Sequence, residues 1–232
     1  MMNHIWAILW KLLKDTLKNK TILIQFVMFP ALTLIMENAI EIADMPEHFF
    51  ANLFAIMYVG MAPLTSVAAV ISEEKEKNTL RVLQMCNVKA FEYLIGNAIY
   101  IIAVCMSGSL VISLAGGYRG KELLYFMLIM LLGHSISVLL GGAIGIASKN
   151  QMMATSLTVP VMMVLAFLPM MSMFNETIKK VAKYIFSEQL FLLINSLSDF
   201  RIETENIIIL ACNAVIIFFV FGAAYRKNVM NP

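Results

Sequence analysis

The chain contains few charged residues. Lys and Arg (17) and Asp and Glu (15) together make up 14% of its 232 residues, whereas 60% are apolar. A soluble domain usually has about 25% charged residues and about 45–50% apolar ones. Such a composition excludes an ordinary soluble enzyme and a disordered chain, because both need a largely polar surface. Lipid must therefore solvate much of this chain.

Cysteine is also scarce. The three cysteines are Cys86, which we expect in the cytosol, and Cys105 and Cys212, which fall inside apolar stretches. None is well placed for a bridge, so a disulfide scaffold is excluded, and their pattern does not indicate a metal site. The small net charge of +2 argues against a nucleic-acid partner.

The sequence lacks the motifs of an intramembrane protease and of an ATPase. The aspartates Asp15, Asp44 and Asp199 all lie outside the apolar stretches, and there is no His-Glu-x-x-His zinc motif. A membrane-embedded protease is therefore disfavoured. A phosphate loop is absent too, since the single Gly-Lys pair, Gly120-Lys121, is followed by Glu rather than Ser or Thr. We predict a chain that is not an enzyme and binds no cofactor or metal.

Long apolar stretches dominate what is present. A membrane-spanning helix needs about 20 apolar residues, and six stretches qualify. They cover residues 21–40, 49–72, 93–115, 123–147, 152–171 and 206–225. We therefore predict an all-α polytopic membrane protein, with six transmembrane helices in one membrane domain over residues 21–232.

The segment 174–201 differs from the six stretches. Lysines and glutamates interrupt it, and its apolar run 190–194 is too short to cross a bilayer. We predict two short interfacial or re-entrant helices on the outer side of the membrane.

Residues 1–20 have the pattern of an amphipathic helix. One face carries Lys11, Lys14, Asp15 and Lys18, and another carries Ile5, Leu9, Leu13 and Leu17 with Trp6 and Trp10. A basic helix with Trp and Leu opposite its lysines is expected to lie in the headgroup plane. The alternative is that residues 1–20 simply form the cytosolic start of the first span.

The distribution of Lys and Arg predicts the orientation. With both termini in the cytosol, the inner segments hold 11 Lys and Arg and the outer segments hold six. Cytosolic segments carry the excess of positive charge. We therefore predict a multi-pass plasma-membrane protein with both termini in the cytosol.

The densest charge run, residues 73–92, follows the second stretch and holds a quarter of all charges. These charges should carry the second helix into water, where Asn78 can end it in the left-handed conformation. Thr79 can then cap a short new helix, on which Leu80 and Leu83 share a face that suits docking to a soluble partner. A solvated loop with one helical turn is the alternative.

This charge run resembles the coupling segment of the type-2 permease family of ATP-binding-cassette exporters. That family's pattern reads roughly Glu-(Arg/Lys)-Glu-x-Gly-Thr-Leu-Glu-x-Leu, followed by Ser-Pro and then Leu-Glu-Phe-Leu-Leu-Gly-Lys. The matching residues are Glu74, Lys75, Glu76, Thr79, Leu80 and Leu83, and then residues 92–96. The departures are Asn78 for Gly, Arg81 for Glu, Cys86-Asn87 for Ser-Pro, and Asn97 for Lys.

The resemblance implies a permease subunit that works with separate chains. Its expected partners are cytosolic ATPase subunits, which would bind ATP and Mg²⁺, and a second permease subunit in a homodimer or heterodimer. The resemblance assigns ATPase coupling to Glu74, Glu76, Asn78, Thr79, Leu80 and Leu83. The expected cargo is hydrophobic or amphipathic, with a peptide or toxin preferred. Drug or lipid efflux, or a receptor or channel without an ATPase, are the alternatives.

Polar residues inside the spans are candidates for a substrate pathway. His134 lies near the middle of the fourth span, where an ionisable group is a functional candidate by default. Hydroxyls on spans two and five are further candidates: Thr65, Ser66, Thr155, Ser156 and Thr158. The alternatives are a neutral imidazole bonded to a neighbouring helix and hydroxyls bonded to their own helix. Gly141 and Gly145 predict close helix packing within the subunit.

Overall fold

The structure of the chain is a computed structural model that describes residues 10–14, 16, 20–39, 46–79, 90–197 and 203–230. These residues form helices and no strand. Six helices are long and apolar enough to cross a membrane: α2 (Lys20–Ala39), α3 (Phe49–Glu76), α5 (Ala90–Ala115), α6 (Gly120–Ala147), α7 (Gln151–Ser172) and α10 (Thr204–Tyr225). The predicted all-α, six-span fold is confirmed.

Two short helices, α8 (Glu176–Ala182) and α9 (Phe186–Asn195), occupy the segment between α7 and α10. Neither is long enough to span a bilayer. A short π-helical turn, η1 (Arg226–Met230), follows α10. The structure thus has the pair of short helices predicted for this segment.

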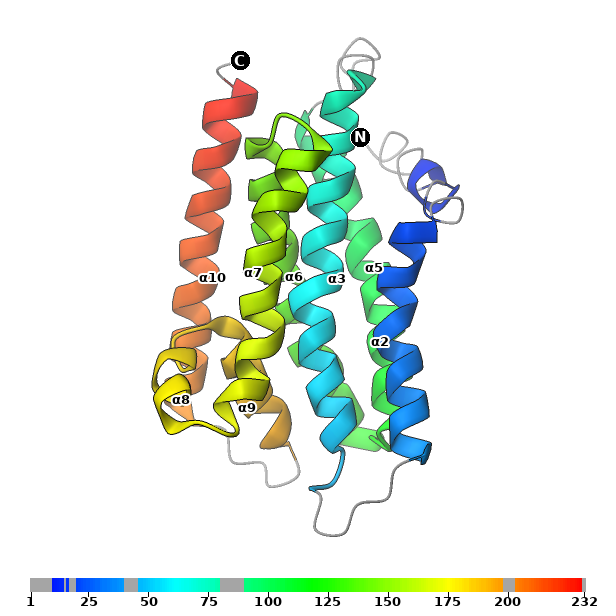
Figure 1. The fold of residues 1–232 in the computed structure, drawn as a ribbon, viewed down its shortest axis with the longest axis vertical. Helices are drawn as coiled ribbons and strands as arrows, with labels where there is room; N and C mark the ends of the chain where they lie inside the picture. Colours follow the sequence, from blue (N-terminus) through cyan, green and yellow to red (C-terminus); the bar gives the residue numbers. More distant parts are fainter. Residues whose placement is uncertain are drawn as a thin grey trace.

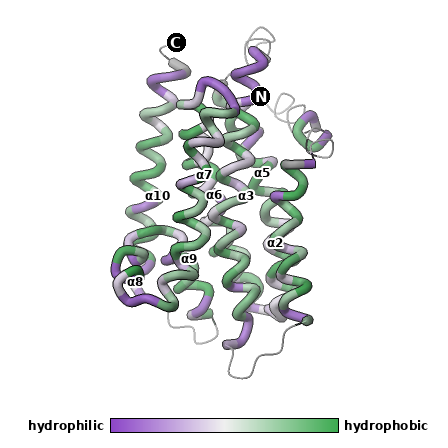
Figure 2. The backbone as a smooth tube through the Cα atoms, viewed as in Figure 1, coloured by the Kyte–Doolittle hydropathy of each residue, from purple (hydrophilic) through white to green (hydrophobic). Residues whose placement is uncertain are grey.

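Helix α3 is the centre of the bundle. It lies between α2 and α7, with α5 and α6 behind it and α10 at the edge (Figure 1). Over an 18-residue apolar stretch of each helix, 72% of the residues are buried inside the protein in α3, compared with 11% in α10. Hydrophobic residues fill the middle of the bundle and hydrophilic ones gather at its two ends (Figure 2).

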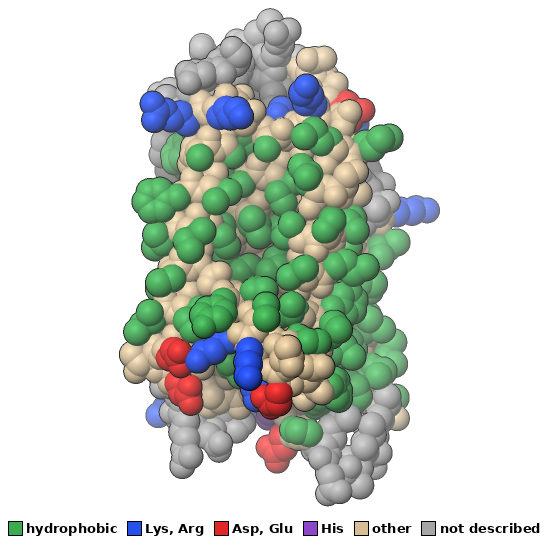
Figure 3. All heavy atoms as spheres, turned by 60° about the vertical axis from the view of Figure 1, so that its left-hand side comes forward, with side chains coloured by type: hydrophobic (Ala, Val, Ile, Leu, Met, Phe, Trp, Pro, Cys, Tyr) green, Lys and Arg blue, Asp and Glu red, His purple; other side chains and the backbone are tan. Residues whose placement is uncertain are grey.

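One face of the molecule shows the same division at its surface. Hydrophobic side chains cover the middle, and Lys and Arg gather towards both ends, where Asp and Glu accompany them (Figure 3). A surface that is apolar over the middle and charged at both ends matches the hydrocarbon core and headgroup layers of a bilayer.

Small residues let α3 approach α6 and α7 closely. A Cβ atom at Gly141 of α6 would overlap the Leu64 carbonyl oxygen, and one at Gly145 would lie 3.1 Å from the Ala68 carbonyl oxygen. The predicted Gly-x-x-x-Gly contact therefore packs within the subunit. On the opposite side, a Cβ atom at Gly60 of α3 would lie 3.0 Å from the α7 backbone.

Asparagines mark three helix boundaries. Asn78 has a φ of 55° just after α3, as predicted for a left-handed stop. The Asn150 side chain accepts from the Met153 amide at the start of α7, and Asn175 caps α8 in the same way. Short polar turns thus separate helices that are otherwise apolar.

The N-terminal helix has an inner face that its charge pattern did not reveal. Leu12 and Thr16 are buried, whereas Trp10 and Leu13 are exposed. The Lys14 ammonium lies 5.1 Å from the centroid of the Trp10 ring. The described part of this helix therefore packs through Leu12 and Thr16 and presents Trp10 outwards. The other residues of the predicted helix lie outside the described part of the chain.

Candidate functional site

The charged end of α3, residues 73–79, is bonded to several other elements. Within it, Glu73 pairs locally with Lys77 at 2.5 Å, one helical turn away. The next three residues, Glu74, Lys75 and Glu76, each bond to a different part of the chain. Residues 73–79 thus form a junction rather than a freely solvated strip.

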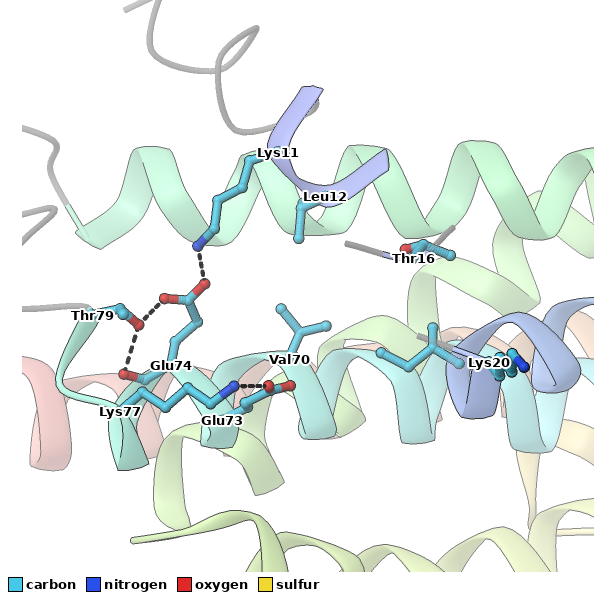
Figure 4. A pocket seen from close by; sticks show the side chains of 10 residues that line it. Lys11, Leu12, Thr16, Lys20, Val70, Glu73, Glu74, Lys77 and Thr79 are labelled. Carbon is cyan, nitrogen blue, oxygen red and sulfur yellow. Dashed lines mark hydrogen bonds and ion pairs between the residues drawn. The ribbon is translucent and has the colours of Figure 1, made fainter. Parts of the chain in front are cut away.

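Glu74 joins α3 to the N-terminal helix (Figure 4). This side chain is only 8% exposed although it is a carboxylate. It pairs with the Lys11 ammonium and accepts a hydrogen bond from the Thr79 hydroxyl. The same hydroxyl lies 3.1 Å from the Glu74 carbonyl oxygen. Buried carboxylates need such partners, so Glu74 holds two segments together at the end of α3.

Lys75 caps the end of α6. Its Nζ lies 2.6 Å from the carbonyl oxygens of both Ile146 and Ser148. The last carbonyls of a helix lack partners within the helix, and a cation there also interacts favourably with the helix dipole. Lys75 therefore ties α3 to the turn between α6 and α7.

Glu76 binds the beginning of α7. Its Oε2 accepts a hydrogen bond of 2.9 Å from the backbone N–H of Gln151, the first residue of that helix. A carboxylate is favoured at this end of a helix because the free N–H groups give it partial positive charge. Lys75 and Glu76 thus bond to the two ends of the α6–α7 turn, Lys75 at the end of α6 and Glu76 at the start of α7.

Two predicted coupling residues, Leu80 and Leu83, lie outside the described residues. The short helix that Thr79 was predicted to cap lies there as well, so its formation stays a prediction. Asn78 ends α3 as expected, and Thr79 turns back to bond with Glu74. Of the coupling residues, the structure therefore brings Glu74, Asn78 and Thr79 together and directs Glu76 towards α7.

A groove of about 740 Å³ starts at Glu76 and runs along the first half of α7. Thr155 and Ser156 line it, together with Met152 and Pro160. Each hydroxyl donates a 2.9 Å hydrogen bond to the carbonyl four residues earlier. Their oxygen lone pairs remain available, so the groove combines weakly polar groups with apolar ones and has one carboxylate at its end.

The third hydroxyl of α7 lies elsewhere. Thr158 is 3% exposed and donates to the Ala154 carbonyl oxygen within its own helix. Its burial separates it from Thr155 and Ser156, which are exposed.

Thr65 and Ser66 lie at the contact between α3 and α2. The hydroxyls of both residues donate to Oε1 of Gln25, at 3.0 and 3.3 Å. The same Thr65 hydroxyl lies 2.7 Å from the Met61 carbonyl oxygen and shares its proton between the two acceptors. These two candidates therefore hold Gln25 in place and do not line the α7 groove.

His134 belongs to α6, and its side chain is fully buried against α5 and α3. Its Nε2 lies 2.8 Å from the Ser109 hydroxyl on α5, and its ring meets the Tyr58 ring edge-on, with the centroids 5.6 Å apart. These are the contacts expected from a helix-packing imidazole. A role of His134 in the substrate pathway stays a prediction.

A polar network at the far end of the bundle was not recognised in the sequence. The Tyr118 hydroxyl donates to Asn52 at 2.6 Å, and the Asn52 amide donates to Asn195 at 2.8 Å. The His48 ring packs 4.4 Å from the ring of Tyr118. Burial raises the pKa of the Tyr118 phenol, which keeps it a neutral donor. An asparagine inside an apolar stretch is the signal that could have revealed this network.

A second unrecognised contact fixes the α8–α9 segment. The Ser172 hydroxyl lies 2.8 and 2.9 Å from the two carboxylate oxygens of Glu188, which is 2% exposed. Lys183 pairs with Glu205 of α10 at 2.8 Å. The segment is therefore bonded to both α7 and α10. Among the described residues, no three His, Cys, Asp or Glu side chains gather as metal ligands.

Comparison with known families matches residues 13–225 to the family described as ABC-2 family transporter protein. The matched range contains all six long helices and the charged end of α3. No curated protein matches the chain.

Proposed function

The chain belongs to the ABC-2 family of transporter proteins, and from this premise we propose that it is the membrane subunit of an ATP-driven exporter. A member of this family is the multi-pass permease component of an ABC transporter and not its ATPase. Cytosolic ATPase subunits would bind ATP and Mg²⁺ and dock against the charged segment 73–92. A second permease subunit, identical or different, would complete the pathway.

The observation that carries this proposal is the set of bonds at the end of α3. Glu74, Lys75 and Glu76 connect it to the N-terminal helix, to the end of α6 and to the start of α7. A partner that displaces residues 73–79 would therefore displace these elements too. Glycine contacts along α3 continue the connection through the membrane, because helices packed backbone to backbone move together. Coupling is transmitted from Glu74 and Glu76 through bonds within the subunit.

The α7 groove supports a hydrophobic or amphipathic cargo. It joins Met152, Val159 and Pro160 to the hydroxyls of Thr155 and Ser156. Flexible methionines adapt to varied apolar ligands, and hydroxyls can bond to a peptide backbone. We prefer a peptide or toxin that leaves the cell, and a drug or lipid is the alternative cargo. The Lys and Arg distribution supports cytosolic termini.

The coupling proposal can be tested by purifying the chain from its native membrane. The wild-type chain should bring with it a separate ATPase, and vesicles that contain both should show ATP-dependent transport. Leu80→Asp combined with Leu83→Asp should abolish both the association with the ATPase and the transport, because charges would replace the apolar docking face. Val181→Asp with Tyr184→Asp is the matched control, since these exposed residues lie in the α8–α9 segment. Unchanged association and transport in the Leu80 and Leu83 variant would overturn the proposal.

A further inference from the structure

A second cavity, of about 560 Å³, lies where the N-terminal helix, the start of α2 and the end of α3 meet (Figure 4). Its polar lining includes three lysines from these three elements: Lys11, Lys20 and Lys77. Its apolar lining comes from the same elements: Leu12, Ile22 and Val70. The cavity therefore has cationic groups and hydrocarbon within one small volume.

The charged side chains that line the cavity, counted over the described residues, sum to one positive charge. Lys11 pairs with Glu74 and Lys77 pairs with Glu73, and both carboxylates also line the cavity. Among the described residues, no carboxylate pairs with Lys20. A ligand with a single negative charge would balance the charges of these five side chains. The headgroup phosphodiester of an anionic phospholipid, such as phosphatidylglycerol, carries that charge.

The cavity lies at the boundary between membrane and water. Lys20 is the first residue of α2, and the apolar spanning part of that helix begins at Ile22. The exposed Trp10, with the Lys14 ammonium over its ring, has the character of an interfacial anchor. A lipid headgroup at this depth would face the lysines, and its glycerol and upper acyl carbons would contact the three apolar residues.

We propose that this cavity binds the phosphodiester of an anionic phospholipid, with Lys20 as its principal cationic contact and Leu12, Ile22 and Val70 as its apolar wall. The bound lipid would hold the N-terminal helix against α3, beside the Glu74–Lys11 pair. Lipid composition would thereby affect the charged end of α3. The proposal needs only a membrane-embedded chain, so it is independent of the ATPase and of the cargo.

The test uses the full chain in phosphatidylcholine nanodiscs that contain increasing amounts of phosphatidylglycerol. Retained lipid is counted by native mass spectrometry. The wild-type chain should retain phosphatidylglycerol in preference to phosphatidylcholine. A juxtamembrane lysine contributes about 1 kcal/mol to anionic lipid binding, so Lys20→Gln should weaken retention about fivefold.

Two control variants make the outcome decisive. Lys20→Arg keeps the charge and should keep the binding, whereas Lys149→Gln removes an exposed lysine that does not line the cavity and should change nothing. Equal retention in the wild type, Lys20→Gln and Lys149→Gln would overturn the proposal. Displacement of the lipid by equimolar inorganic phosphate or glycerophosphoglycerol would overturn it as well, because the site would then bind a soluble phosphate and not a lipid.

Discussion

The carboxylate of Glu76 and the backbone amide of Gln151 lie 2.9 Å apart, so the last residue of α3 caps the first residue of α7. The two residues are 75 positions apart in the sequence. This bond joins the end of α3 to the start of α7, where the groove begins.

Removing the Glu76 cap should uncouple the two helices. Glu76→Ala leaves the Gln151 amide without its acceptor and should cost about 1 kcal/mol of stability, as a lost helix cap does. We expect transport to fall several-fold while the ATPase stays bound. Glu76→Gln keeps an acceptor oxygen and should retain most of the transport. Wild-type transport in Glu76→Ala vesicles would show that this bond transmits nothing.

Lys75 should matter more for stability than Lys77, although the two lysines lie two residues apart. Lys75→Met leaves the Ile146 and Ser148 carbonyls without their donor, which costs about 1–3 kcal/mol when such groups are buried. Lys77→Met removes an exposed pair with Glu73, worth about 0.5 kcal/mol. Thermal unfolding in detergent should rank the variants in that order. Equal unfolding temperatures would contradict the capping role of Lys75.

The contact between α3 and α6 can be tested with one added methyl group. Gly141→Ala places a Cβ against the Leu64 carbonyl oxygen, and overpacking of this kind costs about 1–3 kcal/mol. Gly222→Ala on α10 is the matched control, because a Cβ there meets no atom within 4 Å. Denaturation should show a clear loss of stability for Gly141→Ala and no loss for Gly222→Ala. A similar result for the two variants would mean that α6 can move away from α3 at little cost.

His134 can be assigned to packing or to the pathway by comparison with its partner. Ser109→Ala and His134→Ala both remove the hydrogen bond between α5 and α6. We predict that His134→Ala lowers transport more than Ser109→Ala does, with ATPase association unchanged in both. Transport that falls equally in the two variants would assign His134 to helix packing alone.

The six spans could be predicted because apolar length is a local property of the sequence. The left-handed stop at Asn78 and the two short helices α8 and α9 could be predicted for the same reason, since turn chemistry and segment length are also local. The structure contains both features. The close contact at Gly141 was predicted as packing within the subunit and is found there.

The partners of the charge run could not be predicted, because they come from distant parts of the chain. Glu74 and Glu76 match a family pattern, but only the fold shows that their side chains bond to Lys11 and Gln151. Burial of Leu12 and Thr16 likewise depends on where α3 lies. The sequence shows that hydroxyls lie on spans two and five. Only the structure shows that Thr65 bonds to Gln25 of α2, whereas Thr155 lines the groove along α7.

The buried carboxylate of Glu188 should make stability depend on pH. Burial is the main cause that raises its pKa, while the Ser172 hydroxyl and the Lys179 charge partly oppose that rise. A carboxyl with a raised pKa in the folded state binds its proton more tightly than in the unfolded chain. Its stabilising contribution is therefore complete below the unfolded pKa and is lost as pH rises through the folded pKa.

Glu188→Gln mimics the protonated carboxyl and should remove this dependence. We expect the unfolding temperature of the wild type to fall, relative to that of Glu188→Gln, as pH rises above the ordinary glutamate pKa of about 4.3. Glu176→Gln is the control, because the Glu176 side chain is exposed in the same segment. The measurement is thermal unfolding of the three proteins between pH 4 and pH 8. A constant difference between the wild type and Glu188→Gln would show that this carboxylate is solvated, and that Ser172 does not hold it in a buried site.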